Sequence, residues 1–145
     1  KQQNIITKAQ FGHSLTQRLY ERYFQTSTNK EYAEFMAKDW DADNLTPTEE
    51  TRVQMAILTY LVDIFDVYDK VESGLVDKSH LDTRMNTLKL GVMKTKNAKL
   101  VWSYWKWNRT KDFVKWFENE IYGEDVDKLS VEEIIKKSTE LNTLR

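Results

Sequence analysis

The sequence predicts an all-α protein, a compact bundle of about six or seven helices around a central helix near residues 47–73. Three observations predict this fold class. The 145 residues include only four glycines and one proline, far below the turn supply of a β-sandwich or barrel. Apolar residues recur at three- and four-residue steps along most of the chain. Polar capping residues precede several of these stretches, as they do at helix starts.

Length and composition bound the protein further. A chain of 145 residues, 40% of them hydrophobic, is long enough for one domain with its own core. The absence of cysteine excludes disulfides, thiolate nucleophiles and cysteine-ligated zinc. No stretch approaches the roughly twenty apolar residues that cross a bilayer. We predict one helical domain over residues 1–123 and a C-terminal capping helix or tail over residues 124–145.

The first two helices are predicted from apolar spacing and one cap. Residues 4–25 carry an amphipathic stripe, formed by Phe11, Leu15, Leu19, Tyr23 and Phe24. Asn29 is suited to cap a short second helix. The inward residues of that helix would be Tyr32, Phe35, Met36 and Trp40.

The clearest helix boundary is Thr46-Pro47-Thr48-Glu49, with a threonine N-cap, proline at the first helical position and glutamate three residues past the cap. The helix should run from Pro47 to about Ser73 and end at Gly74. Apolar residues surround most of its circumference, so we expect it to be the most buried helix. They are Val53, Met55, Ile57, Leu58, Tyr60, Leu61, Val62, Ile64, Phe65, Tyr68 and Val71.

One polar strip interrupts this helix, formed by Arg52, Thr59, Asp63, Asp66 and Lys70. Charges buried against neighbouring helices must be paired. We therefore predict that Asp63 and Asp66 form structural ion pairs, and their expected partners are Arg18, Arg22 or Arg84. A metal site on these aspartates with Asp69 and His80 is disfavoured, because Asp69 drifts round the helix and no Glu-x-x-His pair is present.

Three of the four remaining helices are predicted from their caps. Asp77 or Ser79 should cap one that ends near Gly91, with Leu81, Met85 and Leu88 turned inward. Thr110 should cap another that ends at Gly123, and its apolar residues are Phe113, Val114, Phe117 and Ile121. A second capping box at Ser130-Val131-Glu132-Glu133 predicts the terminal helix.

The strongest local bias lies in residues 94–115, which carry seven basic residues and one acid, Asp112. Helical spacing over residues 97–107 places five apolar residues on a predicted core side: Leu100, Val101, Tyr104, Trp105 and Trp107. Trp102 falls on the opposite side. We therefore predict a partner-binding patch made of Trp102, Lys99, Lys106 and Arg109. The alternative is that the N-terminal or the terminal helix covers Trp102 within the same chain.

A basic aromatic segment suits three kinds of partner: an acidic protein, single-stranded nucleic acid that stacks on Trp102, or an anionic headgroup surface. The sequence pI near 6.2 makes nucleic acid the less favoured. Residues 31–75 hold eleven acids and three bases, so acidic helices packed beside basic ones would largely cancel the fields.

Candidates for catalysis are few. His13 and His80 are the only histidines, and the chain has no Walker loop, G-x-S-x-G or H-E-x-x-H motif. We predict no catalytic residues, no metal and no cofactor.

Helix boundaries and core aromatics carry a family resemblance. They are Asn44–Glu50, Phe65–Tyr68, Val71–Asp77, Val101–Trp105 and Phe113–Phe117. Over roughly residues 15–122 the chain resembles an uncharacterised group of bacterial helical proteins, often with a single N-terminal transmembrane helix. The resemblance implies an all-helical domain associated with a membrane through an anchor upstream of Lys1, with residues 1–10 as the juxtamembrane stem. It implies no activity and no catalytic residues, and without the anchor the domain would be cytoplasmic.

Together these observations predict a non-catalytic helical module that binds another protein, as an accessory or scaffold subunit tethered to a membrane complex. The alternative is a binder of single-stranded nucleic acid or anionic surfaces that uses residues 94–115. A third reading is a ligand-binding protein with a cavity in its aromatic core.

Overall fold

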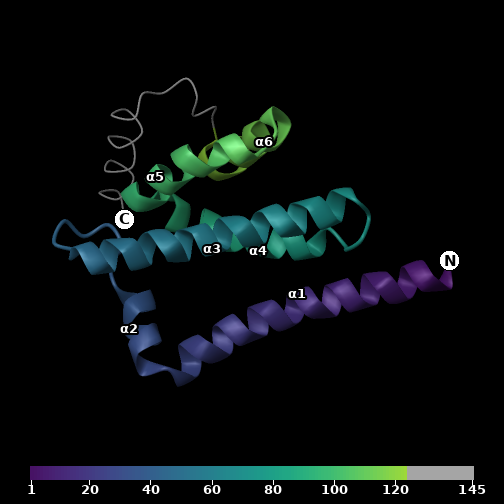
Figure 1. The fold of residues 1–145 in the computed structure, drawn as a ribbon, viewed down its shortest axis with the longest axis horizontal. Helices are drawn as coiled ribbons and strands as arrows, with labels where there is room; N and C mark the ends of the chain where they lie inside the picture. The colour runs from purple at the N-terminus through teal and green to yellow at the C-terminus, as the bar shows by residue number, and fades with distance from the viewer. Residues whose placement is uncertain (124–145) are drawn as a thin grey trace. The chain divides into compact units, whose positions relative to one another are not determined.

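The computed structural model describes residues 1–123, which form helices and no strand (Figure 1). The six α-helices of these residues are α1 (Gln2–Thr28), α2 (Lys30–Ala37), α3 (Pro47–Glu72), α4 (Ser79–Lys89), α5 (Lys96–Trp105) and α6 (Lys111–Tyr122). Two short 3-10 helices, η1 (Val92–Lys94) and η2 (Lys106–Asn108), flank α5. The predicted all-α fold is confirmed. The predicted terminal helix at Ser130 and the whole of residues 124–145 lie outside the described residues.

Side-chain caps fix the helix starts. The hydroxyl of Thr46 accepts the backbone N–H of Glu49 at 3.2 Å, and the Glu49 carboxylate accepts the backbone N–H of Thr46 at 3.5 Å. This reciprocal pair is the predicted capping box of α3. Gly74 follows the helix with φ of +70°, a conformation that costs a residue with a side chain free energy. The Asn29 side chain accepts the backbone N–H of Tyr32 at the start of α2, and the Thr110 hydroxyl accepts that of Phe113 at the start of α6. Both caps are the ones that the sequence indicates.

The chain divides into two compact units. The first contains residues 1–39 and 61–84, and the described part of the second contains residues 40–60 and 85–123. Helix α3 therefore contributes its first half to the second unit and its second half to the first. Among the described residues, no helix is both long and apolar enough to span a membrane.

Helix α3 supplies more buried residues than any other helix in residues 1–123: Val53, Ile57, Leu61, Asp63, Ile64 and Val67. They follow one broad face of the helix. Met55 and Val62 lie off that face and are about half exposed, at 53% and 50%. Burial therefore does not extend round the whole helix, although its apolar residues do.

In the first unit, the apolar stripe predicted for α1 is buried over its first part only. Leu15 is the only buried residue of α1, Phe11 and Leu19 are half-buried, and Tyr23 and Phe24 are exposed. Arg18 and Arg22 lie three and seven residues after Leu15, on the same side of the helix, and both reach α3. This side of α1 therefore combines apolar contact with the pairing of charge.

The core of the second unit is aromatic. Its buried apolar residues are Trp40, Val53, Ile57, Met85, Leu88, Met93, Ala98, Val101, Trp102, Phe113, Phe117 and Ile121. Trp40 stacks on Tyr60, and the rings of Trp102 and Phe117 lie 4.4 Å apart between centroids. At the end of α6 the Tyr122 hydroxyl donates to the Met93 carbonyl at 2.9 Å.

Candidate functional site

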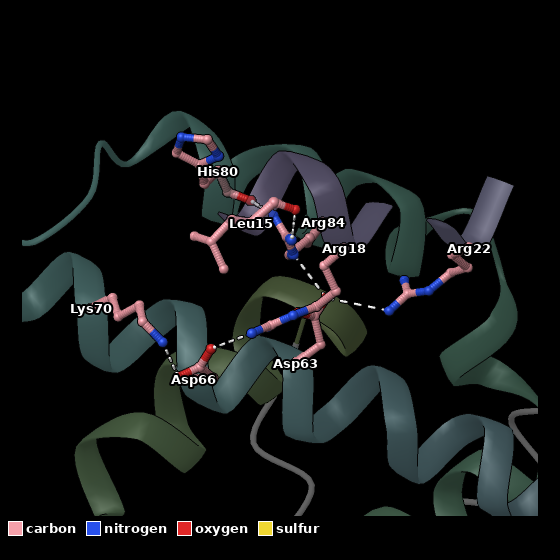
Figure 2. Close-up of polar contacts among 8 residues, drawn as sticks. All are labelled: Leu15, Arg18, Arg22, Asp63, Asp66, Lys70, His80 and Arg84. Atoms are coloured by element: carbon pink, nitrogen blue, oxygen red, sulfur yellow. Dashed lines mark hydrogen bonds and ion pairs between the residues drawn. The ribbon is translucent and has the colours of Figure 1, made fainter. Parts of the chain in front are cut away.

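The Asp63 cluster lies in the first unit and contains all five residues of the predicted ion pairs (Figure 2). Asp63 is buried on α3, with only 6% of its surface exposed. Its carboxylate lies 2.6 Å from Nη1 of Arg18 and 2.7 Å from Nε of Arg84. Nη2 of Arg22 lies 3.6 Å away. Arg18 and Arg22 come from α1 and Arg84 from α4, so one carboxylate joins three helices.

Arg84 is the most deeply buried of the three arginines, with 3% of its side chain exposed. Besides Asp63 it donates to two backbone carbonyls, those of Leu15 at 3.0 Å and His80 at 3.2 Å. Its planar guanidinium therefore bridges α1, α3 and α4 at fixed angles. A lysine at this position would offer a point charge without that fork.

Asp66 forms the outer part of the cluster. It accepts from Nη2 of Arg18 at 3.0 Å and from the ammonium group of Lys70. Burial alone would raise the pKa of Asp66, but the hydrogen bonds from Lys70 and Arg18 outweigh it and lower the pKa below its ordinary value. Burial likewise works against the charged form of Arg18, and its hydrogen bonds to Asp63 and Asp66 prevail and raise its pKa.

The chemistry of this cluster is structural. Its carboxylates face guanidinium and ammonium donors, which occupy the lone pairs that a metal or a proton-transfer step would need. Across residues 1–123, no group of three histidine, aspartate or glutamate side chains has the geometry of a metal site.

The structure does not leave the predicted partner-binding patch open at the surface. Trp102 is buried in the second unit, with 2% of its surface exposed, so the prediction of an exposed Trp102 is wrong. Its indole packs on Phe113 and Phe117 of α6, and its Nε1–H donates to the Glu118 carboxylate at 3.1 Å. The lysines on either side of Trp102 suggest a solvated face, but α6 covers that face.

The cationic residues of the predicted patch also pack against this aromatic core. Lys99 and Lys106 are only 9% and 8% exposed. Lys106 Nζ lies 3.8 Å from the Glu118 carboxylate, and Lys99 Nζ lies 5.5 Å from the centre of the Tyr122 ring. Arg109 is half-buried, with its guanidinium 4.5 Å from the Phe113 ring centre. The aliphatic stems of these residues pack as apolar surface, which sequence polarity does not reveal.

Glu118 is the site residue that sequence reasoning misses. It is fully buried on α6, where it accepts from Trp102 and faces Lys106. The signal in the sequence is its position between Phe117 and Ile121 on the apolar stripe of the helix. An acid on such a stripe requires a buried donor nearby, and Trp102 is the indole within reach.

The aromatic side of the segment faces outward. We define the aromatic face as Leu100, Tyr104, Trp105 and Trp107, which the sequence places in the core. Their exposed fractions are 43%, 71%, 39% and 77%. The helical spacing groups Leu100, Tyr104 and Trp107 as expected, but α5 buries the opposite side, which carries Ala98 and Trp102.

Asp66 should make part of the stability depend on pH. Its pKa is lower in the folded state than in the unfolded chain, so its ion pairs stabilise the fold above the ordinary aspartate pKa of about 3.9 and are lost as the pH falls through the folded-state pKa. We expect Asp66→Asn to lower the free energy of unfolding by about 1 kcal/mol near neutral pH and by progressively less as the pH falls below the ordinary aspartate pKa of about 3.9. Urea denaturation across this range tests it, and a penalty that does not shrink with acid would contradict it.

Trp102→Phe should destabilise the fold by about 2 kcal/mol, because it removes the indole N–H donor from the buried Glu118 carboxylate. The matched control is Trp107→Phe on the exposed aromatic face, which should change stability by less than about 0.5 kcal/mol. Equal losses for the two variants in chemical denaturation would refute the assignment of Trp102 to the core.

Comparisons of this chain with models of protein families, with curated proteins and with solved structures found no match.

Proposed function

We propose that this protein is a non-catalytic helical module that binds an acidic surface of another protein through its aromatic face. The observation that carries the proposal is the exposure of Tyr104 and Trp107, at 71% and 77%. Tyrosine and tryptophan dominate the binding energy of protein interfaces, and a cluster of large apolar side chains open to water marks a contact surface.

The charge around the aromatic face selects an acidic partner. Lys111 and Lys115 are exposed on α6, within eight residues of Trp107 in the sequence. The only acid in residues 94–115 is Asp112. Complementary negative charge on the partner would steer its approach, and the aromatic rings would supply the buried contact.

A second candidate is a binder of single-stranded nucleic acid at the same face. It is favoured by three exposed rings, Tyr104, Trp105 and Trp107, because bases stack on such rings while cations contact phosphates. The net charge of −1 disfavours it, since domains that bind nucleic acid are usually basic overall.

We further propose that the module is an accessory or scaffold subunit of a membrane complex. This part rests on the resemblance to bacterial helical proteins with an N-terminal anchor, in which residues 1–10 would be the stem. Membrane flotation of the native protein together with its partner supports it, and recovery of both in the soluble fraction contradicts it.

The test of the aromatic face begins with a photo-crosslinking amino acid in place of Trp107 in the native cell, followed by identification and purification of the crosslinked protein. Binding of that protein is then measured for a Tyr104→Ser/Trp107→Ser double variant. We expect the double variant to bind at least about a hundredfold more weakly, because each aromatic anchor is worth about 2 kcal/mol or more.

The matched control is Tyr20→Ser/Phe24→Ser on α1, which removes an aromatic pair that is more than half exposed from the other unit. It should leave binding unchanged, and added salt should weaken binding of the unmodified protein. Equal affinity of the two double variants would overturn the proposal. Tight binding of a single-stranded oligonucleotide, lost with Tyr104 and Trp107, would replace it with the second candidate.

A further inference from the structure

An open cavity of about 730 Å³ lies in the first unit and has no role in the proposed protein contact. One wall is α1, from Lys8 to Thr16, the other is the segment from Val76 to His80 that leads into α4, and Val71 of α3 also lines the cavity. The volume falls within the range of pockets that hold small molecules.

The polar groups that line the cavity are mostly donors. Lys8 comes from α1 and Lys78 from the loop before α4, so cations reach it from two sides. His13 and His80 add one imidazole from each wall, and Thr16 adds a hydroxyl. Each of these side chains can donate a hydrogen bond to an anion.

Asp77 is the only acid among the lining residues, and it already has partners. Its carboxylate accepts from the Ser79 hydroxyl at 2.6 Å and from the Ser79 backbone N–H at 3.4 Å. These hydrogen bonds hold the pKa of Asp77 below its ordinary value, so it stays ionised at the start of α4. Two lysines against this one acid leave a net positive charge of one with both histidines neutral.

Gly12 allows the two walls to approach. A Cβ atom at this position would lie 3.3 Å from Nε2 of His80, closer than nearly all real Cβ contacts. Because Gly12 has no side chain, the His80 imidazole can lie against the backbone of α1. Arg84, one helical turn further along α4, donates a hydrogen bond to the His80 carbonyl (Figure 2).

We propose that this cavity binds a phosphate-bearing anion. Lys8 and Lys78 neutralise its charge from opposite walls, and His13, His80 and Thr16 donate hydrogen bonds to its oxygens. A tetrahedral phosphate accepts donors from several directions, which suits groups that come from two separate elements, whereas a planar carboxylate would leave some of them without an acceptor.

Two sources offer this chemistry, a soluble phosphate compound and the headgroup of an anionic phospholipid. The experiment uses inorganic pyrophosphate for the first and, for the second, vesicles of phosphatidylcholine with and without phosphatidic acid. Calorimetry measures binding of pyrophosphate, and vesicle flotation measures binding of lipid. Both probes are applied to the full chain.

Lys8→Gln and Lys78→Gln should each weaken binding of the bound probe about tenfold, because each removes one charge-assisted hydrogen bond. The matched control is Lys30→Gln, an exposed lysine on α2 of the same unit, outside the cavity. The lining lysines are also exposed, so all three variants should fold normally, and circular dichroism checks this.

Loss of pyrophosphate binding in the cavity variants alone establishes a soluble ligand. Loss of binding to phosphatidic acid vesicles alone, with no pyrophosphate binding, establishes a lipid headgroup. An equal effect of Lys30→Gln would show general electrostatic attraction and overturn the site. Failure of the unmodified protein to bind either probe would also overturn it. None of these outcomes bears on the aromatic face, which lies in the other unit.

Discussion

Each of the two units buries one carboxylate, and the need to pair that charge constrains how the surrounding helices pack. Asp63 in the first unit and Glu118 in the second are almost completely inaccessible to water. An unpaired charge in such a place costs several kcal/mol, which is a large part of the stability of a small protein. Asp63 is therefore surrounded by Arg18, Arg22 and Arg84, and Glu118 by Trp102 and Lys106. These partners fix which face of α1, α4 and α5 turns inward.

The same constraint explains why large apolar side chains remain outside. Trp102 donates to the buried Glu118 and also packs on Phe113 and Phe117, and Tyr104 lies on the other side of α5, exposed. On α1, Arg18 and Arg22 lie on the side that meets α3, and Tyr23 and Phe24 are exposed. The exposed aromatic face proposed as a binding surface is therefore the reverse side of the helix whose buried side pairs with Glu118.

Local features of the sequence predict much of the fold. The capping box at Thr46 and the glycine at position 74 fix the ends of α3 because they act within one helical turn. The partners of Asp63 are also predictable, since a carboxylate on a largely apolar helix needs cations and few arginines are available. The face of α5 could not be predicted by counting apolar residues. It packs on α6 and pairs with a carboxylate there, and Lys99 and Lys106 contribute apolar stems that the sequence presents as polar. The cavity between Lys8 and Lys78 joins segments about seventy residues apart, which no local pattern connects.

The most direct test of this dependence is a double-mutant cycle between Asp63 and Arg84, measured by urea denaturation near neutral pH. Asp63→Asn leaves the buried Arg84 guanidinium without its carboxylate, and Arg84→Met removes the most deeply buried of the three cations around Asp63. Each single variant should lower the free energy of unfolding by about 3 kcal/mol. The double variant should lose much less than the sum, with a coupling energy of at least about 2 kcal/mol. Losses that simply add would contradict the view that the pairing of Asp63 organises the helices of the first unit.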